Sequence, residues 1–136
     1  MYIKPVMMIS GALWCANHLK QNKCAELYLS LQKWIDSISL RNPKNTASLY
    51  SYNAVLLGTF AEEINIGRDK IEKYFVELFQ KEGLHAKLMF VYAQPNSNMV
   101  SGTYRFIYNE GSVDARFTFV YHKGKIVNHH SSIQPS

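Results

Sequence analysis

Two histidines and two serines stand together near the end of the chain, in the segment Asn128-His129-His130-Ser131-Ser132. Imidazole and hydroxyl groups donate, accept and transfer protons, and a strand needs no such polarity to fold. The strand-like run 115–121 and the turn 122–125 precede this segment, so the pattern predicts the second strand of a β-hairpin. Because successive strand residues face opposite sides, we expect at least one His and one Ser to point into the space that the sheet covers.

A metal site on this histidine pair is not expected. Adjacent residues of a strand face opposite ways, so His129 and His130 cannot easily bind one ion. A third ligand would have to come from His85, His122 or a cysteine without motif spacing. The sequence therefore predicts neither a metal nor another cofactor.

The strand before the hairpin turn holds three candidates for ligand binding, Arg116, Phe117 and Phe119. Arg116 would serve as a pocket cation for an anionic ligand. Alternation places it opposite Phe117, and the pattern leaves open which of the two faces inward. Arg105 has the same ambiguity on the strand before.

The composition is that of one globular domain. The chain has 136 residues, 47% of them hydrophobic and 18% charged, which suffices for a single core. Its formal charge of +5 is spread along the chain without a basic stripe, so we expect no nucleic-acid partner. No apolar run reaches the roughly 18 residues of a membrane span, so no membrane partner is expected either.

The boundaries that we predict are an N-terminal segment over 1–20 and one domain over 21–136. The segment resembles a weak secretion signal but lacks a clean cleavage site, and the alternative is an arm that packs on the domain. We therefore expect a cytoplasmic protein, with a secreted or periplasmic one as the alternative. Cys15 and Cys24 are either free buried thiols or a disulfide, and the sequence does not choose between them.

Helices come first along the chain and strands last. The spacing of Leu27, Leu31, Trp34, Ile35 and Ile38 predicts one helix face. Pro43 ends that helix and opens a short second one that extends through Tyr50. The range 54–57 reads as a buried strand, and a third helix begins at 67–69 and stops at Gly83. Four strands over 85–93, 99–108, 113–121 and 126–131 then form a meander, which predicts an α+β fold.

These elements and motifs together resemble one family. The motifs are Leu49-Tyr50, the run Asn53 to Thr59, Gly67-Arg68 with Ile71 and Tyr74-Phe75, and Phe117-Thr118-Phe119-Val120-Tyr121 before His129-His130-Ser131-Ser132. They resemble the cone-shaped fold of the nuclear transport factor 2-like (SnoaL-like) superfamily. Within it they are similar to the association-domain family of calcium/calmodulin-dependent protein kinase II, and to the iota-class carbonic anhydrases of that branch.

The resemblance implies a bicarbonate site lined by Thr, Tyr and Ser hydroxyls inside the cone. Carried onto this chain, the site comprises Thr59, Tyr74 and one of Ser131 or Ser132, with His129 or His130 beside them. The implied activity is the reversible hydration of carbon dioxide without a metal, with hydroxyl donors at the carbon dioxide oxygens and a histidine that passes the proton to solvent.

Three positions depart from the family pattern. Asn128 stands where a third His is common, Gly58 where Pro is common, and Asn53 where Asp is common. An amide cannot accept a proton, so Asn53 argues against the steroid isomerases of this fold, although Glu62 or Glu63 could supply a carboxylate.

A non-catalytic function is the alternative hypothesis. Each candidate also has a purely structural interpretation: Thr59 could end a strand, Tyr74 could fill the core, and the histidines could be satisfied in the interior or at an interface. The protein would then bind a small ligand or self-assemble, as kinase association domains do. Because the strands are apolar on both faces, we expect at least a homodimer.

Overall fold

The computed structural model describes residues 4–5, 12–15 and 20–135, with side chains from Trp14 onward. Within these residues, three α-helices precede most of the sheet: α1 (Gln21–Leu40), α2 (Pro43–Ala47) and α3 (Arg68–Leu78). The described strands are β1 (Lys4–Pro5), β2 (Ala12–Cys15), β3 (Tyr50–Leu57), β4 (Asn65–Ile66), β5 (His85–Gln94), β6 (Met99–Tyr108), β7 (Gly111–His122) and β8 (Lys125–Ile133). A 3₁₀ turn, Pro95–Ser97, connects β5 to β6. The predicted α+β class is confirmed.

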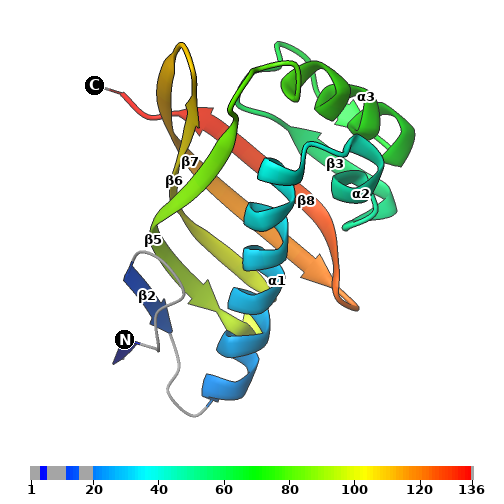
Figure 1. Ribbon diagram of the computed structural model, residues 1–136. Coiled ribbons are helices and arrows are strands. Elements are labelled where there is room, and N and C mark those ends of the chain that lie inside the picture. The colour runs from blue at the N-terminus through cyan, green and yellow to red at the C-terminus, as the bar shows by residue number, and fades with distance from the viewer. Residues whose placement is uncertain (1–3, 6–11, 16–19, 136) are drawn as a thin grey trace.

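All of the described strands join one sheet in the order β1-β2-β5-β6-β7-β8-β3-β4. The predicted meander β5 to β8 forms its antiparallel centre, while β2 runs parallel to β5 and β3 runs parallel to β8. The sheet curls around α1, which lies across its concave face, and α2 and α3 lie beside β3 (Figure 1).

The end of α1 and the start of α2 lie next to Pro43, as the sequence predicted. Arg41, in the left-handed region at φ 54°, ends α1. Pro43 then opens α2, and the Asn42 side chain accepts a hydrogen bond from the backbone N–H of Asn45 at 3.1 Å, as a helix N-cap does.

Two predicted boundaries were wrong. Tyr50 is the first residue of β3, where a helix was expected, because its backbone joins the sheet opposite Ile126. The third helix ends at Leu78, five residues before Gly83. The Phe79 carbonyl there accepts a hydrogen bond from Arg41 Nε at 2.9 Å, which joins the ends of the first and third helices.

The core centres on Trp34, which is 1% exposed. Its ring stacks on Tyr104 at 5.4 Å between centroids and meets the edges of Phe119 and His129, both at 5.2 Å. Phe75 of α3 lies 6.4 Å from the same indole. The curl of the meander therefore buries both Trp34 and Phe75, as the sequence predicted.

Part of the predicted segment 1–20 can be placed. Strand β2 lies along β5, and Cys15 forms a disulfide with Cys24 of α1, so the disulfide is the alternative that the structure contains. The Tyr28 hydroxyl donates to the carbonyl of Trp14. Residues 1–3, 6–11 and 16–19 of the segment lie outside the described residues. No described helix is long and apolar enough to span a membrane.

Candidate functional site

Strand β8 aims one histidine and one serine into the fold. His129 is 2% exposed and Ser131 is 4% exposed, whereas their neighbours His130 and Ser132 are exposed on the opposite face. The register sets this choice, because β8 pairs His129 with Phe119 and Ser131 with Phe117, two inward-facing residues of β7. Of the four residues proposed from the motif, the structure therefore brings only His129 and Ser131 to the interior.

His129 is held on every side. Its Nδ1 lies 2.7 Å from the Tyr50 hydroxyl and its Nε2 lies 3.1 Å from the Tyr104 hydroxyl. Its ring stacks on Phe119 at 3.8 Å between centroids. Burial, with a smaller contribution from the charge of His130, lowers the pKa of His129 well below 6.5, so the ring is neutral.

Ser131 joins this histidine cluster to the loop after β3. The Tyr104 hydroxyl donates to Ser131 Oγ at 2.6 Å, and Ser131 Oγ also contacts Thr59 Oγ1. Thr59 follows the end of β3, a strand that runs parallel to β8 and therefore delivers the two hydroxyls to the same end of the sheet. Burial raises the pKa of Tyr104 and of Tyr50 far above 10, so both act as neutral hydroxyl groups.

Tyr74 of α3 closes the cluster from the helix side. Its ring lies directly against Gly58, where an added Cβ would stand 2.4 Å from the Tyr74 Cζ atom. Its hydroxyl accepts a hydrogen bond from the backbone N–H of Phe60 at 3.3 Å. Burial raises the pKa of Tyr74 to about 12. The glycine that departs from the family pattern is thus what allows this ring to approach.

A small cavity remains among these groups. Its volume is about 10 Å³, about the room for one water molecule. Its polar lining consists of Thr59, Tyr74, Tyr104, His129 and Ser131, and the remaining wall is apolar and aromatic. No ionised side chain of the described residues lines it, so it is a neutral, hydroxyl-rich site.

A much larger hollow lies outside Tyr74 and Leu78, which line both spaces. The hollow has a volume of about 600 Å³, and Phe60 contributes to its apolar floor. Its rim is charged, with carboxylates from Glu62, Glu63 and Glu77 and ammonium groups from Lys73 and Lys81. Tyr74 is therefore the wall between the buried hydroxyls and the surface.

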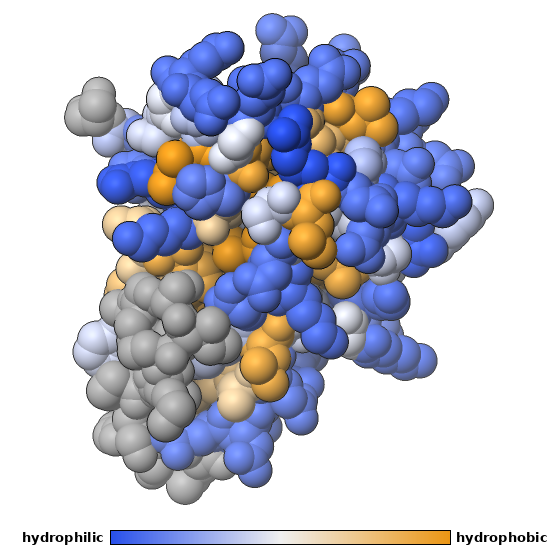
Figure 2. All heavy atoms as spheres, viewed as in Figure 1, coloured by the Kyte–Doolittle hydropathy of each residue, from blue (hydrophilic) through white to orange (hydrophobic). Residues whose placement is uncertain are grey.

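Figure 2 shows polar residues interspersed with apolar ones over one face of the molecule.

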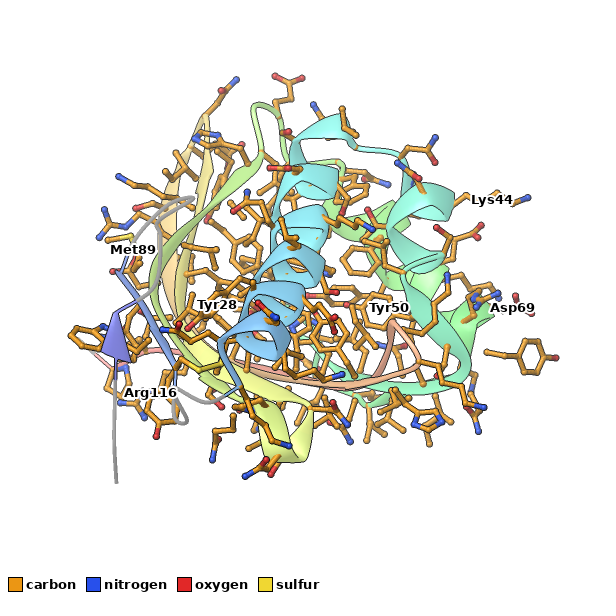
Figure 3. The ribbon with its side chains drawn as sticks, turned by 90° about the horizontal axis from the view of Figure 1, so that it is seen from below. Tyr28, Lys44, Tyr50, Asp69, Met89 and Arg116 are labelled. Carbon is orange, nitrogen blue, oxygen red and sulfur yellow. A yellow bond between two sulfur atoms is a disulfide. The ribbon has the colours of Figure 1, made fainter. Side chains whose placement is uncertain are left out.

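The predicted ligand-binding residues of β7 do not line the cavity. Arg116 is exposed, so its proposed role as a pocket cation does not fit the geometry. It lies on the outer side of the sheet, away from α1, whereas Tyr50 lies inside the fold (Figure 3). Phe117 and Phe119 do face inward, but they pack against Tyr104 and His129. Arg105 faces outward and binds Asp114 at 2.6 Å.

Sequence reasoning missed two members of the cluster, Tyr50 and Tyr104. Tyr104 occupies an inward position of β6, between Val100 and Phe106, where a hydroxyl among apolar neighbours needs a partner. That polarity was the available signal. Tyr50 gave none, because it was assigned to a helix. Within the described part of the chain, no three His, Cys, Asp or Glu side chains are placed to hold a metal ion.

Comparison with solved structures defines the class of protein. An NTF2-like protein of unknown function from Cytophaga hutchinsonii matches with a TM-score of 0.65 and 14% identity, over 80% of this chain and 90% of the other. An epoxide hydrolase/cyclase-like enzyme of pyran ring formation in the polyether salinomycin matches with a TM-score of 0.72 and 11% identity, over 81% and 92%. The chain thus has the NTF2-like cone fold that the sequence predicted.

A third structure defines the family. This protein from Xanthomonas campestris, provisionally classed as a calcium/calmodulin dependent protein kinase II association domain, has a TM-score of 0.72 and 30% identity. The match covers 83% of this chain and 89% of the other. The chain belongs to the family of that protein, the association-domain family. No protein-family model matches the chain, and no curated protein matches it.

Proposed function

We propose that this protein hydrates carbon dioxide reversibly to bicarbonate in the hydroxyl-lined cavity, without a metal. The observation that carries the proposal is the contact of the Thr59 and Ser131 hydroxyls beneath Tyr74. These are the residue types, at the motif positions, that the resemblance to iota-class carbonic anhydrases implies. A neutral cavity also suits carbon dioxide, which is uncharged.

The reaction would use the hydroxyls as hydrogen-bond donors. Water attacks the carbon of carbon dioxide, and negative charge grows on the two oxygens of the substrate. Donors fixed in a water-poor site stabilise such charge without having to reorient. A ligand larger than one water needs more room than the present cavity has, so we infer that Tyr74 turns toward the outer hollow to admit it.

The proton must leave by another route than the one that the sequence suggested. His129 is buried and both of its ring nitrogens contact tyrosine hydroxyls, so it has no path to solvent. His130 lies on the outer face. We therefore propose that the proton passes to water in the outer hollow, and we expect a slow enzyme.

Stopped-flow measurement of carbon dioxide hydration tests the proposal. Chelator-treated wild-type protein should be active, and Ser131→Ala should lose about tenfold to a hundredfold in rate, the effect of one hydrogen bond to a charged transition state. Ser132→Ala is the matched control, since that side chain is exposed, and it should keep the wild-type rate. Absent activity, or equal rates in all three proteins, would refute the proposal.

A self-assembly function is the second candidate, favoured by the outer face of the sheet. The α-helices of the described residues lie on the other side (Figure 1). On β5, Phe90 is 42% exposed. We propose a homodimer through this face. Light scattering should give a mass of at least two chains, and Val120→Asp on β7 should yield monomers. Val76→Asp, at an exposed position of α3, is the control and should keep the wild-type mass. A monomeric wild-type protein would argue against assembly.

A further inference from the structure

We infer that the Cys15–Cys24 disulfide controls access to a strand-binding edge of the sheet. While the disulfide is formed, β2 covers the run Phe90–Ala93 of β5. When a dithiol reduces the disulfide, β2 leaves β5, and the uncovered run pairs with the same run of a second copy of this chain. None of these residues lines the hydroxyl cavity, so the inference does not depend on the proposed function.

The described sheet has a protected edge on the side of β2. Strand β1, which pairs with β2 at the end of the strand order, consists of Lys4 and Pro5. Proteins place these residue types on edge strands, because a charge opposes association and proline has no backbone N–H to donate. At the opposite end of the described sheet, β4 has only two residues. Both ends of the sheet, as described, therefore offer little backbone to another chain.

The part of β5 that β2 covers lacks such protection. This run, Phe90–Ala93, contains neither a charged residue nor a proline. The rest of β5 has its own protection, since Lys87 is exposed and Met89 interrupts the regular pairing with β6. Pro95 follows the end of the strand. Removal of β2 would thus expose an uncharged stretch of backbone N–H and C=O groups, which is a template for pairing with another chain.

The disulfide is the covalent anchor of β2. Only four residues of β2 pair with β5, in parallel, and such a short parallel ladder is weak (Figure 1). The Tyr28 hydroxyl supports it by donating to the carbonyl of Trp14. Cys15 and Cys24 are both 0% exposed, and their bond joins β2 to the first turn of α1. Closing a loop with a sequence separation of 9 should favour the docked strand by about thirtyfold to a hundredfold.

Reduction of the bond balances with a dithiol as the reductant. Because both cysteines are buried, the dithiol reaches them when β2 opens transiently. One thiolate of the dithiol attacks a sulfur of the Cys15–Cys24 bond, and its second thiol completes the exchange. The S–S bond breaks, two electrons and two protons pass from the dithiol to the cysteines, and the dithiol becomes a disulfide. The cysteines are left as two thiols, and β2 is no longer tied to α1.

A second copy fits the uncovered run because the run is complementary to itself. Two copies of Phe90–Ala93 can pair antiparallel about a two-fold axis, with Phe90 opposite Ala93 and Val91 opposite Tyr92 of the other copy. An antiparallel pair of this kind is isologous and closes as a dimer. In this register the Lys87 residues of the two copies lie at opposite ends of the paired run, so they do not repel each other across it.

Hydrogen exchange of the full chain tests the control by the disulfide. The wild type is compared with and without dithiothreitol, beside a variant that combines Cys15→Ser with Cys24→Ser. The backbone amides of Ala12–Cys15 should exchange about thirtyfold to a hundredfold faster in the reduced protein and in the variant, while those of β6 and β7 should not change. Equal exchange of Ala12–Cys15 in the oxidised wild type and the variant would overturn the inference.

Light scattering of the same samples tests the second copy as the occupant. Reduction should raise the wild-type mass about twofold, and the cysteine variant should have the raised mass without reductant. Phe90→Lys, on the covered run, should have the same mass before and after reduction. Ile66→Lys is the matched control at an exposed position of the opposite edge, and its mass should still rise.

Each variant is compared with its own oxidised form, so a dimer through the outer face of the sheet does not affect the readout. A wild-type mass that reduction leaves unchanged would overturn the inference, as would a rise that persists in Phe90→Lys. Growth far beyond twofold would also overturn it, because an isologous pair closes.

Discussion

Acid should destabilise this protein through one buried side chain, His129. Burial first, and the charge of His130 second, lower the pKa of His129 well below the 6.5 of an exposed histidine. In the unfolded chain the same ring is exposed and takes up a proton near pH 6.5. Below that pH the unfolded state therefore binds more protons than the folded state does, so the free energy of unfolding falls as the pH falls.

The expected effect is large for a single residue. One proton taken up on unfolding gives a slope of about 1.4 kcal/mol per pH unit. Over about two pH units below 6.5 the loss is about 2 kcal/mol, as long as the folded ring stays neutral. Domains of this kind are stable by about 5–15 kcal/mol, so the loss is readily measured.

Urea unfolding at a series of pH values, followed by tryptophan fluorescence, measures the slope. Glutamine does not titrate. The free energy of unfolding of His129→Gln should therefore be lower at every pH, but it should not fall further between the pKa of exposed histidine and the pKa values of Asp and Glu. His122→Gln, on an exposed position of β7, should keep it. Equal slopes in the wild type and His129→Gln would refute the reasoning, because the buried ring would then titrate as an exposed one does.

Three further changes follow from the packing. Gly58→Ala should cost about 1–3 kcal/mol in urea unfolding, because its Cβ would meet Tyr74 at 2.4 Å; Gly124→Ala, where no atom lies within 4 Å but φ is +77°, measures backbone strain alone. Cys24→Ser removes the disulfide to Cys15, which closes a loop with a sequence separation of 9, and should lower the free energy of unfolding by about 2–3 kcal/mol. A reductant should destabilise the wild type by the same amount and leave the variant unchanged. Tyr121→Phe should leave the free energy of unfolding unchanged or raise it by up to about 1 kcal/mol, because the buried Tyr121 hydroxyl has no partner. A fall in the free energy of unfolding would show that the hydroxyl makes a hydrogen bond and would contradict this prediction.

The sequence was sufficient for the elements that depend on local pattern. The apolar face of α1, the proline that opens α2 and the turns of the meander are all set by neighbours along the chain. The disulfide was left open because two cysteines without a motif do not reveal their separation in space. Tyr50 was misassigned because its pairing with Ile126 comes from a strand that lies far along the sequence.

Local sequence pattern could not predict which histidine and which serine of the segment 128–132 face inward. Alternation predicted that at least one histidine and one serine would face inward, so the residues alone indicated that proton-handling groups would enter the space that the sheet covers. The identity of the inward pair depends on a bulge in β8. Tyr121 pairs with Ile126 and Val120 with Asn128, so Val127 is an extra residue that shifts the alternation. Without it, inward-facing Ile126 would be followed by inward-facing His130 and Ser132.

What the sequence by itself determined was therefore the fold class, the order of the elements and the polar character of the last strand. Only the tertiary structure decided that His129 and Ser131 meet Tyr50, Tyr104 and Thr59. The physical reason is that these hydrogen bonds join residues separated by up to 79 positions along the chain, which only the pairing of distant strands brings together.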